Sequence, residues 1–131
     1  MPCLAASFDP AIGPLLRVGL LPLDEAEPVY FHALIDTGAS RTCISMRAAE
    51  KAGLLPSGMV PMISATEVKA VNTYLTHLVF PFHGQPLVQR GVFLMEFFQD
   101  ENAPFQILLG RDILGRGQFS MSLDGHFVFS L

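Results

Sequence analysis

The stretch Ala33-Leu34-Ile35-Asp36-Thr37-Gly38-Ala39-Ser40 places a carboxylate on a short polar turn at the end of an apolar segment. Residues 29–35 have the length and composition of a β-strand, which would anchor the turn in the core. Gly38 has no Cβ, so another backbone can approach the turn closely, and its N–H can hold the Asp36 carboxylate. The plainest interpretation is an ordinary turn, since Asp, Thr and Gly all favour turns.

A carboxylate in such a turn also suits acid–base chemistry. Hydrolysis of a peptide bond needs a base that takes a proton from water and an acid that protonates the leaving side. Two carboxylates about 3 Å apart do both, because like charges that close hold one proton between them. The chain contains one Asp-Thr-Gly turn, so this chemistry predicts that a second copy supplies the other carboxylate.

Composition restricts the classes of function. Half of the 131 residues are hydrophobic and 15% are charged, with a mean hydropathy of +0.42. We therefore expect a single domain, residues 1–131, with part of its apolar surface in a subunit interface. A net charge of −4 and eight scattered Lys and Arg residues predict no nucleic-acid partner.

The apolar runs are too short to span a bilayer, so no membrane partner is expected. The first ten residues lack the basic start and apolar core of a secretion signal, which predicts a cytoplasmic protein. Neither the four histidines nor the two cysteines have metal-ligand spacing, so no metal is expected. Cys3 and Cys43 are expected to be reduced, and Asp124-Gly125 to be a hairpin turn rather than a second catalytic aspartate.

The pattern along the chain is that of a mainly β domain with one or two short helices. Residues 1–14 are expected to be a loosely ordered arm, and residues 56–58 a turn. Ser45 and Gly53 are expected to cap and close a helix over 46–52, and a second helix is expected over 111–116. Strands are predicted at 15–20, 29–35, 42–44, 59–64, 71–82, 88–98, 106–109, 118–123 and 126–131.

Two features downstream of Asp36 give the turn a context. Strands 59–64 and 71–82 predict a long hairpin with its tip near residues 66–69. Further on, Ile107-Leu108-Leu109-Gly110-Arg111-Asp112 is an apolar strand that glycine breaks into a short helix.

In this order the segments resemble the retroviral-type (retropepsin-like) single-domain aspartic proteases, over about residues 15–131. The resemblance implies a homodimeric, closed β-barrel acid-protease fold. It also implies an aspartic endopeptidase with Asp36 as the catalytic residue and Thr37 and Gly38 as its support. A hairpin flap would close over an extended peptide or protein substrate. The nucleophile would be a water molecule activated by the pair of Asp36 carboxylates, the catalytic dyad, so the reaction would need no cofactor.

The resemblance assigns further residues. Gly110, Arg111 and Asp112 match a loop that forms the floor of the site, and Ala39 and Ser40 would line it. Substrate would also meet the hairpin tip at Ala65, Thr66 and Glu67. The C-terminal hairpin, 118–131, is expected to add to the dimer interface.

The sequence departs from the family pattern in three places. Ser40 stands where many retroviral members have an acid that pairs with the arginine, so Arg111 needs another partner, either a backbone carbonyl or Asp112. No glycine occurs between Gly58 and Gly84, although the family's flap is rich in glycine. Ala39 replaces a hydroxyl residue of the pepsins, which predicts activity at less acidic pH than theirs.

Two alternatives to an active enzyme stay open. Ser40 and the glycine-free hairpin are consistent with a catalytically weak or inactive dimer of the same fold that binds peptides or proteins. A purely structural β domain would leave the Asp36 turn without a symmetry mate.

Overall fold

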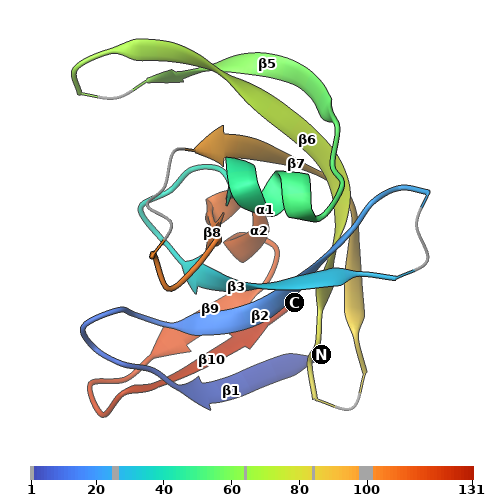
Figure 1. Ribbon diagram of the computed structural model, residues 1–131. Helices are drawn as coiled ribbons and strands as arrows, with labels where there is room; N and C mark the ends of the chain where they lie inside the picture. Colours follow the sequence, from blue (N-terminus) through green and yellow to red (C-terminus); the bar gives the residue numbers. More distant parts are fainter. Residues whose placement is uncertain (1, 25–26, 64, 84, 98–101) are drawn as a thin grey trace.

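The computed structural model describes residues 2–24, 27–63, 65–83, 85–97 and 102–131 (Figure 1). Two short helices accompany ten strands in this part of the chain. In chain order the elements are β1 (Cys3–Ser7), β2 (Leu15–Leu21), β3 (Val29–Ile35), β4 (Cys43–Ser45), α1 (Met46–Lys51), β5 (Pro56–Ile63), β6 (Val68–Phe80), β7 (Leu87–Phe97), β8 (Ile107–Leu109), α2 (Arg111–Leu114), β9 (Gln118–Met121) and β10 (His126–Ser130).

Six strands close into a barrel in the order β2-β3-β8-β4-β7-β6, and β6 returns to pair with β2. The long strand β6 makes closure possible because its two halves have different partners. Its second half pairs with β2 from Gly19↔Val79 to Leu21↔His77. Its first half pairs with β5, and this β5–β6 hairpin arches over α1 and β7 (Figure 1). The predicted mainly β, closed-barrel fold with short helices is confirmed.

A second sheet, β1-β10-β9, packs below the barrel (Figure 1). Phe127 and Phe129 of β10 are almost fully buried, at 1% and 0% exposure. The Phe129 ring lies edge-on to Phe80 and Phe82, with ring centroids 6.0 and 5.9 Å away. These contacts join the three-stranded sheet to the hydrophobic core of the barrel.

The N-terminal arm is where the expectation is wrong. Residues 3–7 form β1, which pairs antiparallel with β10 from Cys3↔Ser130 to Ser7↔His126. Small residues such as Ala5 and Ala6 give a weak strand signal on their own. The ladder of backbone hydrogen bonds offered by β10, whose paired residues lie 119 to 127 positions away in the sequence, orders this segment.

Other local expectations can be compared directly. Ser45 caps α1 by accepting a hydrogen bond from Ala48 N–H at 3.2 Å, and Gly53 ends the helix region with a φ of +74°. The turn predicted at 56–58 is instead the start of β5, where the register with β6 shifts between Pro56 and Gly58. A bulge there absorbs the proline and the glycine within the strand.

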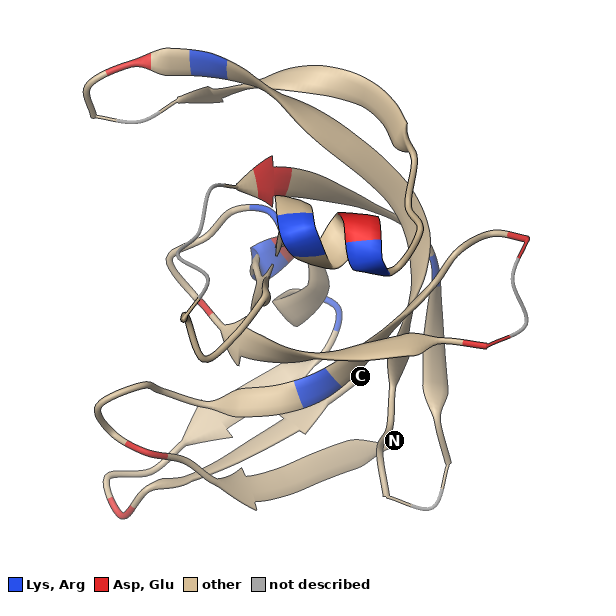
Figure 2. Ribbon diagram, in the orientation of Figure 1, with Lys and Arg blue, Asp and Glu red and all other residues tan. Residues whose placement is uncertain are grey.

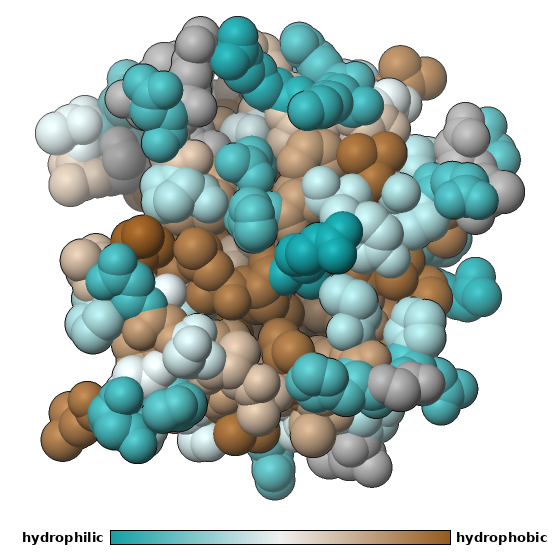
Figure 3. All heavy atoms as spheres, turned by 60° about the horizontal axis from the view of Figure 1, so that its bottom comes forward, coloured by the Kyte–Doolittle hydropathy of each residue, from teal (hydrophilic) through white to brown (hydrophobic). Residues whose placement is uncertain are grey.

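Charged residues lie mainly in loops, on the two helices and near the ends of strands (Figure 2). Viewed from the side of the β1-β10-β9 sheet, apolar side chains gather across the middle of the surface, with polar residues around them (Figure 3). The β5–β6 hairpin also exposes Met59, Ile63 and Val68, at 64%, 78% and 67%. Within the described ranges, no helix has the length and hydropathy needed to cross a lipid bilayer.

Candidate active site

The Asp36 turn begins where β3 leaves the barrel. Ile35 is buried at 5% exposure, and Asp36 N–H donates to the carbonyl of Leu109 on β8 at 3.0 Å. Gly38 N–H donates to Asp36 Oδ1 at 2.9 Å, and a Cβ on Gly38 would lie only 3.2 Å from that oxygen. The half-buried carboxylate is therefore held by its own loop, and the bond from Gly38 N–H is the one expected from the sequence.

Strand β8 passes between the two strands that flank the turn. It pairs parallel with β3 through Ile35↔Leu109 and antiparallel with β4 through Cys43↔Leu108. The chain thus leaves β3, forms the Asp36 turn and returns as β4 on the other side of β8. At the end of β8, a Cβ on Gly110 would lie 2.6 Å from the carbonyl carbon of Arg41. Only glycine permits so close an approach of the two loops.

Arg111 has found a partner in place of the missing acid. Its Nη1 donates to the Thr37 carbonyl oxygen at 2.9 Å, and its backbone N–H donates to the Ala39 carbonyl at 2.8 Å. The first alternative from the sequence, a backbone carbonyl, is therefore the one observed. These two bonds tie the start of α2 to both sides of Gly38 in the turn.

Asp112 has a different role, and it involves a residue that sequence reasoning missed. Thr42 is completely buried, and its Oγ1 donates to Asp112 Oδ1 at 2.7 Å. Thr42 N–H donates to Asp112 Oδ2 at 3.1 Å, while Gly110 N–H donates to Thr42 Oγ1 at 3.1 Å. One threonine thus binds both ends of the floor loop. Its only sequence signal was a hydroxyl directly before the apolar pair Cys43-Ile44.

A groove of about 610 Å³ opens beside the turn. One wall is the loop after Asp36, including the predicted residues Ala39 and Ser40, and the facing wall is the second half of β5, residues 60–63. The β5 residues, Arg41 and Met95 belong to no motif that would assign them to the site from the sequence. The residues that line the groove are Gly38, Ala39, Ser40, Arg41, Cys43, Val60, Pro61, Met62, Ile63 and Met95.

The predicted contacts at the tip of the β5–β6 hairpin are placed differently. Ala65, Thr66 and Glu67 are exposed and precede β6, and they are not among the described residues that line the 610 Å³ groove. Glu67 instead lines a neighbouring cavity of about 420 Å³, between the hairpin and the region where β7 ends at Glu96 and Phe97. Both cavities lie where the hairpin overhangs the barrel.

Cys43 lines the groove as a protonated thiol. Burial raises its pKa to about 11, and the negative charge of Asp112 adds to the effect. Cys43 Sγ also donates to the Arg41 carbonyl, at 3.4 Å. A neutral thiol is a poor nucleophile and a poor metal ligand, so Cys43 is part of the wall of the groove.

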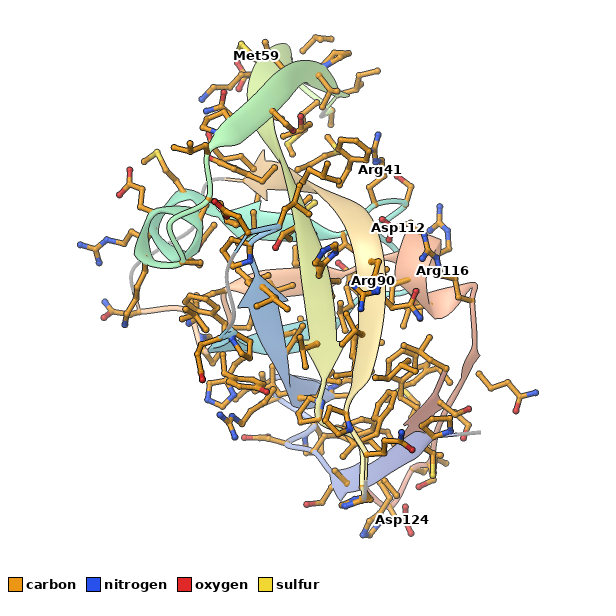
Figure 4. The ribbon with its side chains drawn as sticks, turned by 90° about the vertical axis from the view of Figure 1, so that its right-hand side faces the viewer. Arg41, Met59, Arg90, Asp112, Arg116 and Asp124 are labelled. Carbon is orange, nitrogen blue, oxygen red and sulfur yellow. The ribbon has the colours of Figure 1, made fainter. Side chains whose placement is uncertain are left out.

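The other candidate groups lie elsewhere. Asp124 occupies the turn of the β9–β10 hairpin, at the opposite end of the molecule from Met59 on β5 (Figure 4). Hydrogen bonds from Ser122 and then His126 lower the pKa of Asp124, as suits a hairpin turn. Among the described residues, His, Cys, Asp and Glu side chains form no group of three that could hold a metal ion.

The part of the chain that carries this site matches a known protein family. The model of a family described as gag-polyprotein putative aspartyl protease matches residues 26–116, which include the Asp36 turn and the floor loop. No curated protein sequence matches the chain.

Among solved structures, the chain is similar to a retropepsin-like aspartic protease from Rickettsia conorii. The TM-score is 0.67 at 15% identity, over 97% of this chain and 89% of that one. A more distant likeness, with a TM-score of 0.45 and 18% identity, is to the retroviral protease-like domain of Ddi1 from Leishmania major, over 84% of this chain and 82% of that one. The family model covers well over half of the sequence, and the likeness to the first structure extends to the whole fold. The chain therefore belongs to the retropepsin-like aspartyl protease family.

Proposed function

We propose that this protein is an aspartic endopeptidase that works as a homodimer, with Asp36 of each copy forming the catalytic dyad. The observation that carries the proposal is the Asp36 turn itself. Gly38 N–H holds the half-buried carboxylate, Leu109 of β8 holds the Asp36 backbone N–H, and a groove of about 610 Å³ lies beside the turn. A single copy carries one such turn, so the dyad requires two chains.

The chemistry follows from two carboxylates that share one proton. The ionised Asp36 takes a proton from a water molecule, which attacks the peptide carbonyl, while the protonated Asp36 of the other copy gives its proton to the carbonyl oxygen. The first Asp36 then passes the proton from water to the leaving nitrogen as the C–N bond breaks, and the second Asp36 recovers its own proton from the intermediate, so that the dyad again holds one proton. Rigid placement matters because the two carboxylates must stay within hydrogen-bond distance. Arg111 and Thr42 support that placement by fixing the loop from both sides.

The β5–β6 hairpin would act as the flap. It overhangs the barrel, and its β5 residues 60–63 form a wall of the groove, so a substrate in extended form would lie between the hairpin and the loop after Asp36 (Figure 1). Extended peptides bind well to such surfaces because their backbone groups can pair with a strand. Exposed Ile63 and Val68 near the hairpin tip offer apolar contacts with substrate or with the second copy.

Digestion of a peptide library by the purified protein and by Asp36→Asn, across about pH 3 to 8, tests the proposal. We expect cleavage by the wild type, none by the variant, and a dimer in sedimentation at the concentration used. Cleavage that survives Asp36→Asn would come from a contaminant. A dimer that binds peptides without cutting them would instead support the alternative of an inactive, peptide-binding dimer of the same fold.

A further inference from the structure

We propose that Arg41 makes the groove beside the Asp36 turn a subsite for an acidic side chain of the peptide substrate. The inference rests on the proposed function in one respect, because it takes this groove as the place where peptide binds. It adds the class of substrate, which the retropepsin-like family assignment does not supply.

The groove beside the Asp36 turn is mostly apolar and carries one charged residue among those described. Its facing wall is apolar, with Val60, Pro61, Met62 and Ile63, and Met95 lies between the walls. Arg41 is the charged residue among the described residues that line it. A substrate side chain entering the groove would therefore meet mostly apolar residues and one arginine.

The Arg41 guanidinium is available to a ligand. In the described part of the chain, no hydrogen bond or ion pair involves the Arg41 side chain, and the residue is exposed. The neighbouring arginines are occupied, since Arg111 donates to Thr37 and Arg116 donates to Asp112 O and Gln89 Oε1. Figure 4 shows Arg41 above Asp112 and Arg116, on the side nearer to the β5–β6 hairpin.

The nearby acid, Asp112, forms no ion pair with Arg41 in the described part of the chain. Asp112 accepts hydrogen bonds from Thr42 N–H, Thr42 Oγ1 and Ile113 N–H, so its oxygens are committed to the floor loop. The Arg41 backbone is also fixed, because Gly110 packs against it and Thr42 follows it. A guanidinium on a fixed backbone with no internal partner is arranged to bind a carboxylate.

Selection of random peptides on immobilised protein tests this without relying on cleavage. The bait is the Asp36→Asn protein, so that bound peptides stay intact, and the same selection is run with Arg41→Gln and Arg41→Glu added. Arg90→Gln, on the exposed part of β7, is the matched control because it removes the same charge outside the groove. Circular dichroism shows that each variant is folded.

We expect Asp or Glu to be enriched at a fixed position of the bound peptides. A Glu-to-Gln change at that position of one selected peptide should weaken binding roughly tenfold, as for a hydrogen bond between charged groups. Arg41→Gln should abolish the preference, Arg41→Glu should replace it with Lys or Arg, and Arg90→Gln should retain it. No binding, or an acidic preference that survives Arg41→Gln, would overturn the inference.

Cleavage separates this inference from the proposed function. If the wild type cuts peptides with no acidic preference, the protease stands and the role of Arg41 fails. If acidic peptides bind through Arg41 and are never cut, the subsite stands and the endopeptidase activity fails.

Discussion

Thr42 and Asp112, which lie 70 positions apart in the sequence, are joined by a hydrogen bond of 2.7 Å between Thr42 Oγ1 and Asp112 Oδ1. The same hydroxyl accepts from Gly110 N–H at 3.1 Å. Because Thr42 and Gly110 are both buried, water cannot replace these bonds if one partner is lost.

We therefore expect Thr42→Val to destabilise the fold by about 2–4 kcal/mol, since it keeps the shape of the side chain but removes the hydroxyl that donates to Asp112 Oδ1 and accepts from Gly110 N–H. Urea unfolding measures the loss. The matched control is Thr42→Ser, which keeps the hydroxyl and should lose only about 1 kcal/mol for the methyl group. Equal stability of the two variants would show that the hydroxyl has no structural role.

The second prediction concerns Gly110. A Cβ there would lie 2.6 Å from the Arg41 carbonyl carbon and 2.7 Å from its oxygen, so Gly110→Ala must push the two loops apart. We expect a loss of at least about 2 kcal/mol in unfolding free energy, as for other overpacked sites. Gly58→Ala, whose Cβ would be 3.5 Å from Thr73 Oγ1, is the control and should cost much less. A Gly110→Ala protein as stable as Gly58→Ala would contradict the close packing of the loops.

Arg111→Met tests how the turn is held. The variant keeps the length and apolar part of the side chain but loses the bond to the Thr37 carbonyl. Since Arg111 is exposed, the cost in stability should be about 1 kcal/mol, whereas the Asp36 turn loses a constraint that catalysis would need. We expect kcat/KM for a cleaved peptide to fall at least about tenfold. An unchanged kcat/KM would mean that Gly38 and β8 hold the turn without Arg111.

Much of the barrel could be predicted from the sequence, because its strands are locally encoded. The predicted strand 29–35 matches β3 residue for residue, and the predictions for β2 and β8 differ from the structure by one residue at one end. The prediction for β7 begins one residue late, and its last residue, 98, lies outside the described residues. The Ser45 cap and the Asp124-Gly125 hairpin turn were equally local signals, and both are confirmed.

What could not be predicted depends on partners distant in sequence. β1 is ordered by β10, and the barrel closes because β6 meets β2, pairings that no local pattern specifies. At the candidate site, Asp36, Gly38 and Arg111 were found because a motif carries them. Thr42, Arg41 and residues 60–63 were missed because their positions follow from how the loops pack around β8 and under the β5–β6 hairpin.

Alkaline pH should weaken the fold through Tyr74. Burial, followed by the hydrogen bond to Glu96, raises its pKa from 10.0 to about 12. Between these values the unfolded chain has released the proton and the folded chain still holds it. The contribution of Tyr74 to the free energy of unfolding is therefore fully present below pH 10 and is lost as the pH rises toward 12. The slope for this one group is at most about 1.4 kcal/mol per pH unit. Urea midpoints measured from pH 8 to 11 should fall less steeply for Tyr74→Phe than for the wild type, and identical slopes would exclude this role.

The C-terminal hairpin is expected to add to the dimer interface, and removing it would be the simplest test. The structure makes truncation unsuitable, because removing β10 would also remove Phe127 and Phe129 from the core. A point substitution on the outer face of β10 separates folding from assembly. Val128 is 42% exposed and lies between two small residues, Ala5 of β1 and Ser120 of β9.

If two copies meet through this face, Val128→Glu places two desolvated carboxylates near the two-fold axis, where like charges and buried charge both oppose association. We expect a folded monomer in sedimentation, with peptide cleavage lost because the Asp36 dyad is not assembled. Val88→Glu, at a valine of β7 that is 37% exposed, is the matched control and should remain dimeric and active. A Val128→Glu protein that stays dimeric and active would place the interface on another surface, where the exposed Ile63 and Val68 of the β5–β6 hairpin would be the next residues to substitute.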